Sequence, residues 1–457
     1  MKTATIVGSG LVGSLWAIYL AKEGYQVNIY EKRPDLRKAK ISAGKSINLA
    51  TSYRGWKALD AIGIGDEIRK IAIPMYGRTM HDHSGDTTYQ PYGINNQAIY
   101  SVSRGEINCK LMDLAEQTGK TTFYFNEECI GADLEKGICQ FKNSSTGEMH
   151  EVKSDVVFAT DGAFSAVRYH AMQKIDRFSY SQNYIEDGYR EILLPANHDG
   201  SFKMAKNTLH IWPRGRFMLI ALPNFGGSFT CTLFMPFEGH QHCFNNLTSR
   251  EKVSDFFKTT FPDFYNMMPN VADAWGDHPL SSLAIIRCYP WFHGKTLLMG
   301  DAAHATVPFF GQGMNCGFED CTVMWELMKK HKEDWKKIGE EYQVLRKPNG
   351  DAVQDLSLQN YLVMRNRVAD PDYLLLQKIE RRVAELYPDY YFPMYSMVSF
   401  TDIEYRTALK KGNEQELMIE SIIKTHNLTN TTGMEDIDKV IHLWFKQTYS
   451  HIAKQIS

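Results

Sequence analysis

The chain has 457 residues, of which 43% are hydrophobic, and its formal net charge is -2. This length predicts two or three domains, taking roughly 150 residues for each. The near-neutral charge gives no electrostatic basis for binding nucleic acid or an anionic membrane surface. The eight cysteines form no C-x-x-C pair, so we expect reduced, buried thiols in a cytoplasmic protein. A strand is expected from residue 4, and no apolar run reaches about 18 residues, so we expect neither a signal peptide nor a transmembrane segment.

The amino-terminal segment is expected to fold as strand, helix, strand and helix, over residues 4–7, 11–22, 27–30 and 53–62. The first turn reads GSGLVG, a G-x-G-x-x-G motif with Gly8, Gly10 and Gly13, and Glu31 ends the second strand. In this motif the glycines allow a tight turn, approach of a pyrophosphate and helix packing, while the acid binds ribose hydroxyls. We therefore predict a dinucleotide site without a 2′-phosphate. The alternative is a glycine-rich turn that binds nothing.

The middle of the chain alternates between β segments and helices. Hairpins are expected over 74–100, a helix over 104–119 and a strand over 155–160. TDGAFSAVR follows that strand, so Asp161 either contacts a cofactor or caps a helix that runs through Val167. Residues 185–285 form the main β-rich block, with strands expected at 210–213, 217–222 and 229–237.

The segment at residues 300–317, GDAAHATVPFFGQGMNCG, is the most informative one. It follows an apolar strand at 296–299 and precedes an amphipathic helix at about 315–330, so Asp301 ends a third strand. Ligands of open α/β sheets bind at that edge, and a helix amino terminus there carries about half a positive charge. This arrangement suits a cofactor that becomes anionic when reduced. No second G-x-G-x-x-G exists, so a nicotinamide would have no dinucleotide fold of its own.

Histidines near these motifs have a catalytic and a packing interpretation. His304 is either a general base or a packed residue with both ring nitrogens satisfied. His81 and His83 form an H-x-H pair, but no further ligands of suitable spacing lie nearby, so no metal site is expected.

Other candidate residues are equally open on local grounds. A lone arginine in a strand, such as Arg78, is typical of a solvated charge. Asn360 and Met364 share one helix face, which is typical of packing. Phe309 and Phe310 fit either a core or the wall of a substrate pocket.

The motifs together resemble the single-component flavoprotein aromatic hydroxylases and, among them, the family of kynurenine 3-monooxygenases. The resemblance spans residue 8 to about 400, and the runs HIWPR and SFTCTLFMPFE are more specific than the flavin motifs. It rests on these and on the runs GSGLVGSLWA, GKSINLA, SVSR, TDGAFSAVR, GDAAHATVPFFGQGMNCGFEDC and FPMYSMVSF. GKSINLA has Lys45 where the family commonly has arginine, so no cofactor contact is assigned to it.

The resemblance implies an α/β fold with α+β elements, in which a Rossmann-like FAD-binding domain is interleaved with a β-sheet substrate domain and followed by a carboxyl-terminal helical cap. The expected FAD-binding parts are 1–73, 101–178 and 285–330, the substrate sheet is 74–100 and 179–284, and the helical region is 331–457. Prolines at 348, 371, 388 and 393 are expected to interrupt helices that continue to about residue 410.

The resemblance also implies the site residues. Kynurenine would be held through its carboxylate by Arg78 and Tyr92, with Asn360 and Tyr395 completing the site, and its ring would lie against Phe309 and Phe310. An arginine with a phenol hydroxyl is a suitable partner for a carboxylate. The expected FAD contacts are Gly8, Gly10, Val12, Gly13, Glu31, Arg33, Ala50, Arg104, Asp161, Asp301, Met314 and Asn315.

The implied reaction uses bound FAD, NADPH as co-substrate and O2, and delivers oxygen from a flavin C4a-hydroperoxide to ring position 3 of L-kynurenine, a step of tryptophan catabolism and quinolinate formation. No protein base or nucleophile is assigned. The alternatives are a hydroxylase of another anthranilate-like aromatic compound, a halogenase, whose usual W-x-W-x-I-P signature is absent, and a non-catalytic flavin-binding protein. Animal members of the family have a hydrophobic carboxyl-terminal membrane anchor, whereas the tail from about residue 413 is polar here. This difference favours a soluble, cytoplasmic, bacterial-type enzyme. A homodimer is left open.

Overall fold

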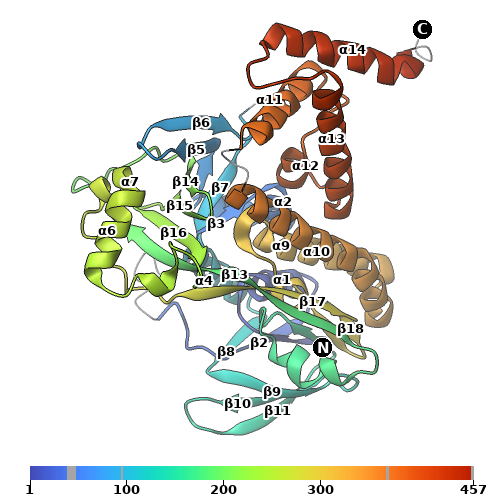
Figure 1. The fold of residues 1–457 in the computed structure, drawn as a ribbon. Coiled ribbons are helices and arrows are strands. Elements are labelled where there is room, and N and C mark those ends of the chain that lie inside the picture. The colour runs from blue at the N-terminus through green and yellow to red at the C-terminus, as the bar shows by residue number, and fades with distance from the viewer. Residues whose placement is uncertain (39–47, 94–95, 367–369, 454–457) are drawn as a thin grey trace.

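The structure is a computed structural model that describes residues 1–38, 48–93, 96–366 and 370–453 (Figure 1). A six-stranded sheet lies at its centre, in the order β18-β19-β12-β1-β2-β8, and every pair except β18–β19 is parallel. The predicted strands and the helix α1 (Leu11–Lys22) between the first two are confirmed. The predicted strands are β1 (Thr3–Val7), β2 (Gln26–Glu31), β12 (Val156–Ala159) and β19 (Thr296–Leu298), whereas β8 (Thr121–Phe125) and β18 (Phe292–His293) were not predicted.

Two small sheets flank this centre. The antiparallel sheet of β9 (Glu127–Asp133), β10 (Ile138–Asn143) and β11 (Met149–Lys153) was not predicted. It packs on the central sheet through Tyr30 and Phe141, whose ring centroids are 4.1 Å apart. The other small sheet combines β3 (Asn48–Thr51), β4 (Ile73–Met75) and β7 (Ile99–Ser103). Within 74–100, therefore, only the hairpin of β5 (Gly77–His81) and β6 (Thr87–Pro91) joins the large β-sheet.

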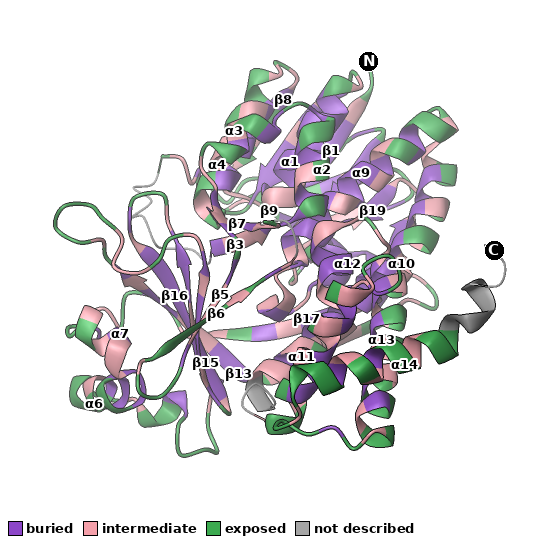
Figure 2. Cartoon of the chain, turned by 90° about the horizontal axis from the view of Figure 1, so that it is seen from above, coloured by how far each residue is buried: buried purple, intermediate pink, exposed green. Residues whose placement is uncertain are grey.

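The large sheet has seven strands in the order β17-β13-β16-β15-β14-β5-β6. Its strands from the predicted β-rich block are β13 (Ser179–Leu194), β14 (Leu209–Arg214), β15 (Phe217–Pro223), β16 (Phe229–Pro236) and β17 (Ser281–Tyr289). The helices α6 (Arg250–Thr260) and α7 (Pro262–Met267) cover one face through a core that includes Trp212 and Phe264. The other face is directed toward the central sheet and α10 (Figures 1 and 2).

Helices from distant parts of the sequence cover the central sheet and form the carboxyl-terminal region. The prediction that Pro348 interrupts a helix is wrong, because this residue lies inside α10 (Trp335–Asn366), whereas Pro371 opens α11 (Pro371–Leu386). The helical pattern also continues beyond residue 410, through α13 and α14. The remaining helices are α2 (Tyr53–Ala61), α3 (Gly65–Arg69), α4 (Arg104–Gln117), α5 (Ala166–His170), α8 (Asp301–His304), α9 (Gly313–His331), α12 (Met394–Phe400), α13 (Tyr405–Thr425) and α14 (Met434–Ala453), with 3-10 turns at Met172–Lys174, Phe244–Asn246 and Pro308–Phe310.

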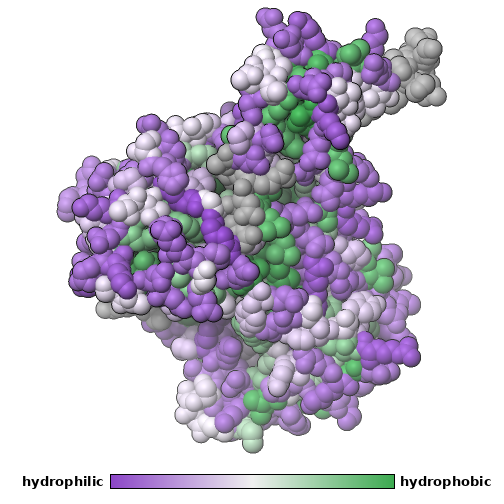
Figure 3. All heavy atoms as spheres, in the orientation of Figure 1, coloured by the Kyte–Doolittle hydropathy of each residue, from purple (hydrophilic) through white to green (hydrophobic). Residues whose placement is uncertain are grey.

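The largest core lies around the central sheet, with α1 and α9 on it, and a separate core joins α11, α13 and α14. Figure 2 shows these buried residues in purple. On the face drawn in Figure 3, hydrophilic residues predominate, and hydrophobic ones gather between the large sheet and α10 and among the carboxyl-terminal helices. In the described part of the chain, no helix is long and apolar enough to cross a membrane. All eight cysteines are unpaired, and all but Cys109 are buried.

Candidate active site

The carboxyl ends of three neighbouring parallel strands meet at one edge of the central sheet, which we call the nucleotide edge. β1 lies beside β12 and β12 beside β19, and the turns that follow begin with Gly8, Thr160 and Met299. The Thr160 hydroxyl donates to the carbonyl oxygens of Val7 (3.1 Å) and Gly8 (2.9 Å). The three segments that the sequence placed at strand ends thus lie together, where α/β proteins bind ligands.

The protein itself requires two of the three motif glycines, but not the middle one. A Cβ atom on Gly8, which has a φ of +95°, would lie 2.8 Å from the Cα of Asp161. A Cβ on Gly13 would lie 2.2 Å from the carbonyl oxygen of Gly8. A Cβ on Gly10 would meet only the carbonyl oxygen of Thr160, at 4.0 Å. This free space beside Gly10 is what an approaching pyrophosphate needs, so the turn fits a dinucleotide cofactor.

Glu31 lies next to this turn and is almost completely buried. Its carboxylate accepts hydrogen bonds from the backbone N–H of Ser9 (2.9 Å) and from Nε of Arg33 (2.7 Å). Burial raises the pKa of Glu31, but the hydrogen bonds from Arg33 and Ser9 outweigh it and hold this pKa below its usual range. Glu31 is therefore a fixed anion beside the turn, as a ribose-binding carboxylate should be.

Asp161 takes the capping role, and its other carboxylate oxygen stays available for the predicted cofactor contact. Its Oδ2 accepts from the backbone N–H groups of Ala166 (2.7 Å) and Val167 (3.2 Å), so it caps α5. Its Oδ1 is buried and has no hydrogen-bond partner among the residues that the structure describes. Burial raises the pKa of Asp161 despite these hydrogen bonds. A buried oxygen without a partner at this edge fits contact with a polar group of a cofactor.

The third strand end is fastened to the other two. Gly300 has a φ of +57°, and a Cβ there would lie 2.9 Å from Cγ2 of Val12, while one on Gly317 would lie 2.6 Å from the same atom. Val12 therefore fills a notch between two glycines and joins the first motif to the third. Arg168, which is buried, donates to the carbonyl oxygen of Ala302 at 2.7 Å and so joins the second motif to the third. The side chain of Asp301 is exposed at this edge.

The amino terminus of α9 is available for an anionic group. Among the residues that the structure describes, no side chain caps this helix, which begins at Gly313, so they leave its first N–H groups and the positive end of its dipole available. Asn315 fixes its position, because its Oδ1 accepts from the N–H of Ser52 (2.9 Å) and its Nδ2 donates to the carbonyl oxygen of Ala50 (2.8 Å). Met314 is buried beside it. These features fit the ring end of a flavin, which carries negative charge when reduced.

Arg104, the first residue of α4, is exposed, and Lys45 lies outside the described residues. Asn108 was not among the predicted residues, but its Nδ2 donates to the carbonyl oxygen of Ser9 at 3.2 Å and so joins α4 to the first turn. An asparagine inside a predicted amphipathic helix could have drawn attention to this contact.

His304 is the centre of a buried ionic network, and it is not placed as a general base. Its Nε2 lies 2.6 Å from Oδ2 of Asp320, whose Oδ1 accepts from Nε of Arg346 at 2.7 Å. Asp320 Oδ2 also accepts from the N–H of Gly300 at 2.9 Å, so the network holds the third turn. Burial lowers the pKa of His304, but the adjacent Asp320 carboxylate outweighs it and raises this pKa well above its usual range. His304 is therefore a charged positioning residue.

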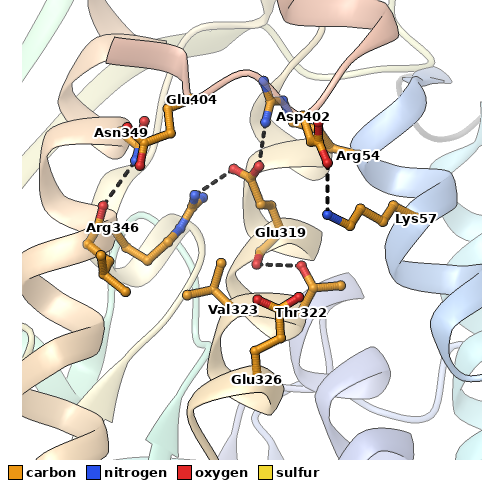
Figure 4. A pocket seen from close by; sticks show the side chains of 11 residues that line it. Arg54, Lys57, Glu319, Thr322, Val323, Glu326, Arg346, Asn349, Asp402 and Glu404 are labelled. Carbon is orange, nitrogen blue, oxygen red and sulfur yellow. Dashed lines mark hydrogen bonds and ion pairs between the residues drawn. The ribbon is translucent and has the colours of Figure 1, made fainter. Parts of the chain in front are cut away.

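The network continues outward to a polar cavity of about 210 Å³ (Figure 4). There Glu319 is paired with both Arg346, at 2.5 Å, and Arg54. Lys57 is paired with Asp402 at 3.1 Å. Each of the three cations that line this cavity is paired with Glu319 or Asp402, so it is a gap within an ionic network between α2, α9, α10 and the α12–α13 connection.

The predicted carboxylate-binding residues form a second group, which we call the Arg78 cluster. It consists of Arg78, Tyr92, Phe310 and Tyr395. The Arg78 guanidinium lies 5.3 Å from the ring centroid of Tyr92 and 4.8 Å from that of Tyr395, and these two rings are stacked at 5.2 Å. Phe310 stacks on Tyr395 at 5.6 Å. The structure thus brings together residues from β5, the β6–β7 loop, the third motif and α12.

The electrostatics of the Arg78 cluster suit an anionic ligand. Arg78 forms no ion pair with a carboxylate of the described residues, and the buried Tyr92 hydroxyl has no hydrogen-bond partner among them. Burial lowers the pKa of Arg78, but the two tyrosines outweigh it and raise this pKa above its usual range. Burial also raises the pKa of Tyr92 well above its usual range. The cluster therefore offers a cation and a protonated phenol.

Asn360 and Phe309 lie next to this cluster. Asn360 Nδ2 donates to the carbonyl oxygen of Phe309 at 2.5 Å, and it lies 3.4 Å from the sulfur of Met364. The Phe309 ring packs against Tyr361 at 4.6 Å and against Phe234 at 5.0 Å. Phe309 is therefore largely a core residue, whereas the neighbouring Phe310 contacts the Arg78 cluster directly.

The two histidines of the H-x-H pair do not point into one common site. His81 is buried and lies 2.7 Å from Asp263 and 2.9 Å from His210, whereas His83 is exposed. In the described ranges, no group of three or more side chains has the arrangement of a metal site.

The fold and the nucleotide edge define a flavoprotein with the FAD-binding monooxygenase fold. The family model described as an FAD binding domain matches residues 1–357. The structure resembles 2-methyl-3-hydroxypyridine-5-carboxylic acid oxygenase, with a TM-score of 0.66, 18% identity, and coverage of 82% of this chain and 95% of the other. A tetracycline destructase gives a TM-score of 0.58 at 16% identity, covering 92% of this chain and 97% of the other. At these identities the likeness concerns the fold alone.

The chain belongs to the kynurenine 3-monooxygenase family. It is 48% identical to the kynurenine 3-monooxygenase of Flavobacterium johnsoniae, over 95% of this chain and 97% of that protein. It is 40% identical to that of Sus scrofa, over 99% of this chain and 97% of the relative. These comparisons confirm the resemblance and the fold class expected from the sequence. The individual cofactor and substrate contacts stay predictions.

Proposed function

We propose that this protein uses FAD, NADPH and O2 to hydroxylate L-kynurenine at ring position 3, giving 3-hydroxykynurenine. The observation that carries this proposal is the Arg78 cluster, in which an arginine without a carboxylate partner in the described chain lies beside two stacked tyrosine rings. Phe310 connects this cluster to the third motif of the nucleotide edge. A site for a carboxylate thus lies next to the predicted site of the flavin ring.

Bound FAD would supply the electrons that activate dioxygen, and the residues of the nucleotide edge would hold it. Gly10 leaves room for its pyrophosphate, Glu31 is placed for a ribose, and the free amino terminus of α9 is placed for the flavin ring. The protein then contributes orientation and favourable electrostatics rather than a covalent step.

The Arg78 cluster would hold the amino-acid end of kynurenine. A charged guanidinium and a phenol O–H can both donate to one carboxylate, and such charge-assisted hydrogen bonds are stronger than neutral ones. Phe310, and the edge of Phe309, would exclude water from the aromatic ring. Because the amino group of the substrate already activates that ring, the chain needs no general base, which agrees with the pairing of His304 to Asp320.

Three finer predictions accompany this function. We propose a cytoplasmic location, supported by eight unpaired cysteines. We also propose the domain division at 1–73, 74–100, 101–178, 179–284, 285–330 and 331–457. The third prediction, a homodimer, can be tested by measuring the mass of the protein in solution by light scattering.

A steady-state assay tests the proposed function. NADPH oxidation should depend on kynurenine, and 3-hydroxykynurenine should form in proportion. A panel that includes anthranilate and other aromatic amino acids separates this proposal from a hydroxylase of another substrate. If a different aromatic compound gives faster coupled turnover, the substrate assignment is wrong and the enzyme class stands.

A further inference from the structure

Arg78 lies on a strand that has little backbone support. β5 pairs with β14 through only three register positions, Leu209–Arg78, His210–Thr79 and Ile211–Met80. Its other neighbour, β6, is the exposed edge strand of the sheet. A short ladder beside an exposed edge leaves the position of a strand weakly specified. Something else is needed to fix the guanidinium against the two tyrosine rings.

Polar side chains on the opposite face of β5 provide this support. The hydroxyls of Thr79 and Thr208 lie 3.0 Å apart. Two residues along, Nε2 of His81 lies 2.9 Å from Nδ1 of His210. The first contact joins β5 to the residue that precedes β14, and the second joins β5 to β14 itself. Side chains at alternate positions of a strand share one face, so Arg78 lies on the other face of β5.

His81 also joins β5 to α7. Its Nδ1 lies 2.7 Å from Oδ2 of Asp263, which accepts from Nε1 of Trp212 at 2.8 Å. The imidazole ring of His81 stacks on Trp212, with centroids 4.0 Å apart. We call His81, His210, Trp212 and Asp263 the histidine network. His81 is 5% exposed and His210 is 2% exposed, so water does not compete for these hydrogen bonds.

His210 is held on its far side by a backbone carbonyl group. Its Nε2 lies 2.8 Å from the carbonyl oxygen of Ala205, which can only accept, so this nitrogen carries a proton. Burial lowers the pKa of His210 to about 4, so at neutral pH its Nδ1 is an acceptor. The His81 ring bridges β14 and α7, because its Nε2 faces His210 Nδ1 and its Nδ1 faces the Asp263 carboxylate.

The other charged group at this end of β5 reinforces the same attachment. Arg214, on β14, donates to the carbonyl oxygens of His81 (3.0 Å) and Asp82 (2.9 Å). The Asp82 side chain is exposed and is occupied by the N–H of Ser84 at 2.8 Å. The charged groups around His81 thus come from β14, α7 and the β5–β6 turn, and the Arg78 cluster contributes none of them.

We propose that His81 is a positioning residue, which acts through its hydrogen bonds to Asp263 and His210 to hold β5 so that Arg78 meets the carboxylate of the substrate. This inference rests on the proposed function, because it gives Arg78 a substrate to bind. It also accounts for the H-x-H pair, in which one histidine fixes the strand and the other is a solvent-exposed neighbour.

The test is a pair of matched variants in the FAD-loaded protein. His81→Phe keeps a ring for stacking on Trp212 but removes both hydrogen bonds, and His83→Phe makes the same change two residues away on the surface. Kynurenine binding is measured by titrating the flavin absorbance, together with KM, kcat and FAD content. We expect His81→Phe to weaken kynurenine binding and raise KM by roughly tenfold, with kcat and FAD content near wild type. His83→Phe should match the wild type.

A yellow His81→Phe protein with unchanged kynurenine affinity would overturn the proposal, since the network would then be only part of the core. Equal losses of FAD and kynurenine would overturn it as well. If His81→Phe does not fold, Asp263→Leu decides, because it keeps a side chain of similar size while removing the group that His81 contacts; wild-type affinity there contradicts the proposal. Failure of the proposed function is distinct, because the wild-type protein itself would not bind or turn over kynurenine.

Discussion

The nucleotide edge and the Arg78 cluster differ in what holds their atoms in place. At the nucleotide edge the contacts involve backbone, and a single added carbon at Gly8 or Gly13 would lie within 3 Å of another backbone atom. In the Arg78 cluster the contacts are between side chains about 5 Å apart, and they come from four distant segments. The geometry of the predicted cofactor site is thus built into tight turns, whereas that of the proposed substrate site depends on how separate elements dock.

The largest expected effect is at Gly10, where the protein leaves space. Gly10→Val should fold but lose FAD, because the new side chain would occupy the place of the pyrophosphate. Circular dichroism and the flavin absorbance of the purified protein measure these two properties. Gly226→Val is the matched control, since a Cβ at Gly226 meets nothing within 4 Å and this glycine is remote from the edge in sequence. A yellow Gly10→Val protein would show that this turn does not hold the cofactor.

Arg78→Ala tests the other region. We expect roughly a 100-fold rise in the KM for kynurenine, or about 3 kcal/mol, because the substrate carboxylate would lose a charged partner. FAD content should be unchanged, since the residue makes no contact with the nucleotide edge. Arg78→Lys keeps the charge without the planar fork and should lie between the two. Unchanged kinetics in Arg78→Ala would remove the carboxylate-binding role.

The His304 network should make folding stability depend on pH. Burial raises the pKa of Asp320, but His304 and Arg346 lower it to about 2. Its unfolded value is near 3.9, so this carboxylate stabilises the fold above that pH, and about 2 to 3 kcal/mol is lost as pH falls toward 2. The pKa of His304 is raised, so its contribution is full below pH of about 6.5 and is lost as pH rises through the folded value.

Urea unfolding of the wild type, His304→Gln and His331→Gln at several pH values, with FAD in fixed excess, measures this. His331 is paired with Glu341 at 2.6 Å nearer the surface, so its substitution should cost little. His304→Gln should lower the unfolding midpoint clearly and flatten the acid dependence. Equal effects of the two substitutions would contradict the role assigned to the buried pair.

The smallest expected effect concerns a single hydroxyl. Because the Tyr92 hydroxyl has no hydrogen-bond partner in the described chain, Tyr92→Phe should leave stability unchanged while weakening kynurenine binding roughly tenfold. Tyr361→Phe is the contrasting variant, since its hydroxyl donates to Asp187 at 2.6 Å and its loss should cost stability. If Tyr92→Phe destabilises the fold and leaves binding intact, the hydroxyl has a structural partner instead.

Features of the fold that depend on residues close together in the sequence could be predicted. The strand ends at Gly8, Asp161 and Gly300 could be placed because apolar runs and glycines mark them locally. The fold class and the family followed from the same motifs and were confirmed. The hairpin of β5 and β6 was expected, but its separation from β4 and β7 depends on pairing with β3, which no local pattern indicates.

Features that depend on contacts between distant parts of the chain could not be predicted from the sequence. His304 had no assignable role because its partners Asp320 and Arg346 lie on α9 and α10, and only the docking of these helices brings them together. Pro348 was expected to break a helix, but α10 continues through it. The partners of His81 lie 129 and 182 residues away, so the H-x-H spacing alone could not distinguish the two histidines.

The most direct test of the central claim is a single turnover experiment with isotopically labelled dioxygen. The FAD-loaded protein, NADPH and L-kynurenine should yield 3-hydroxykynurenine that contains one labelled oxygen atom at ring position 3, as measured by mass spectrometry and NMR. NADPH oxidation that produces only hydrogen peroxide, or a product whose new hydroxyl carries no label, would contradict the account.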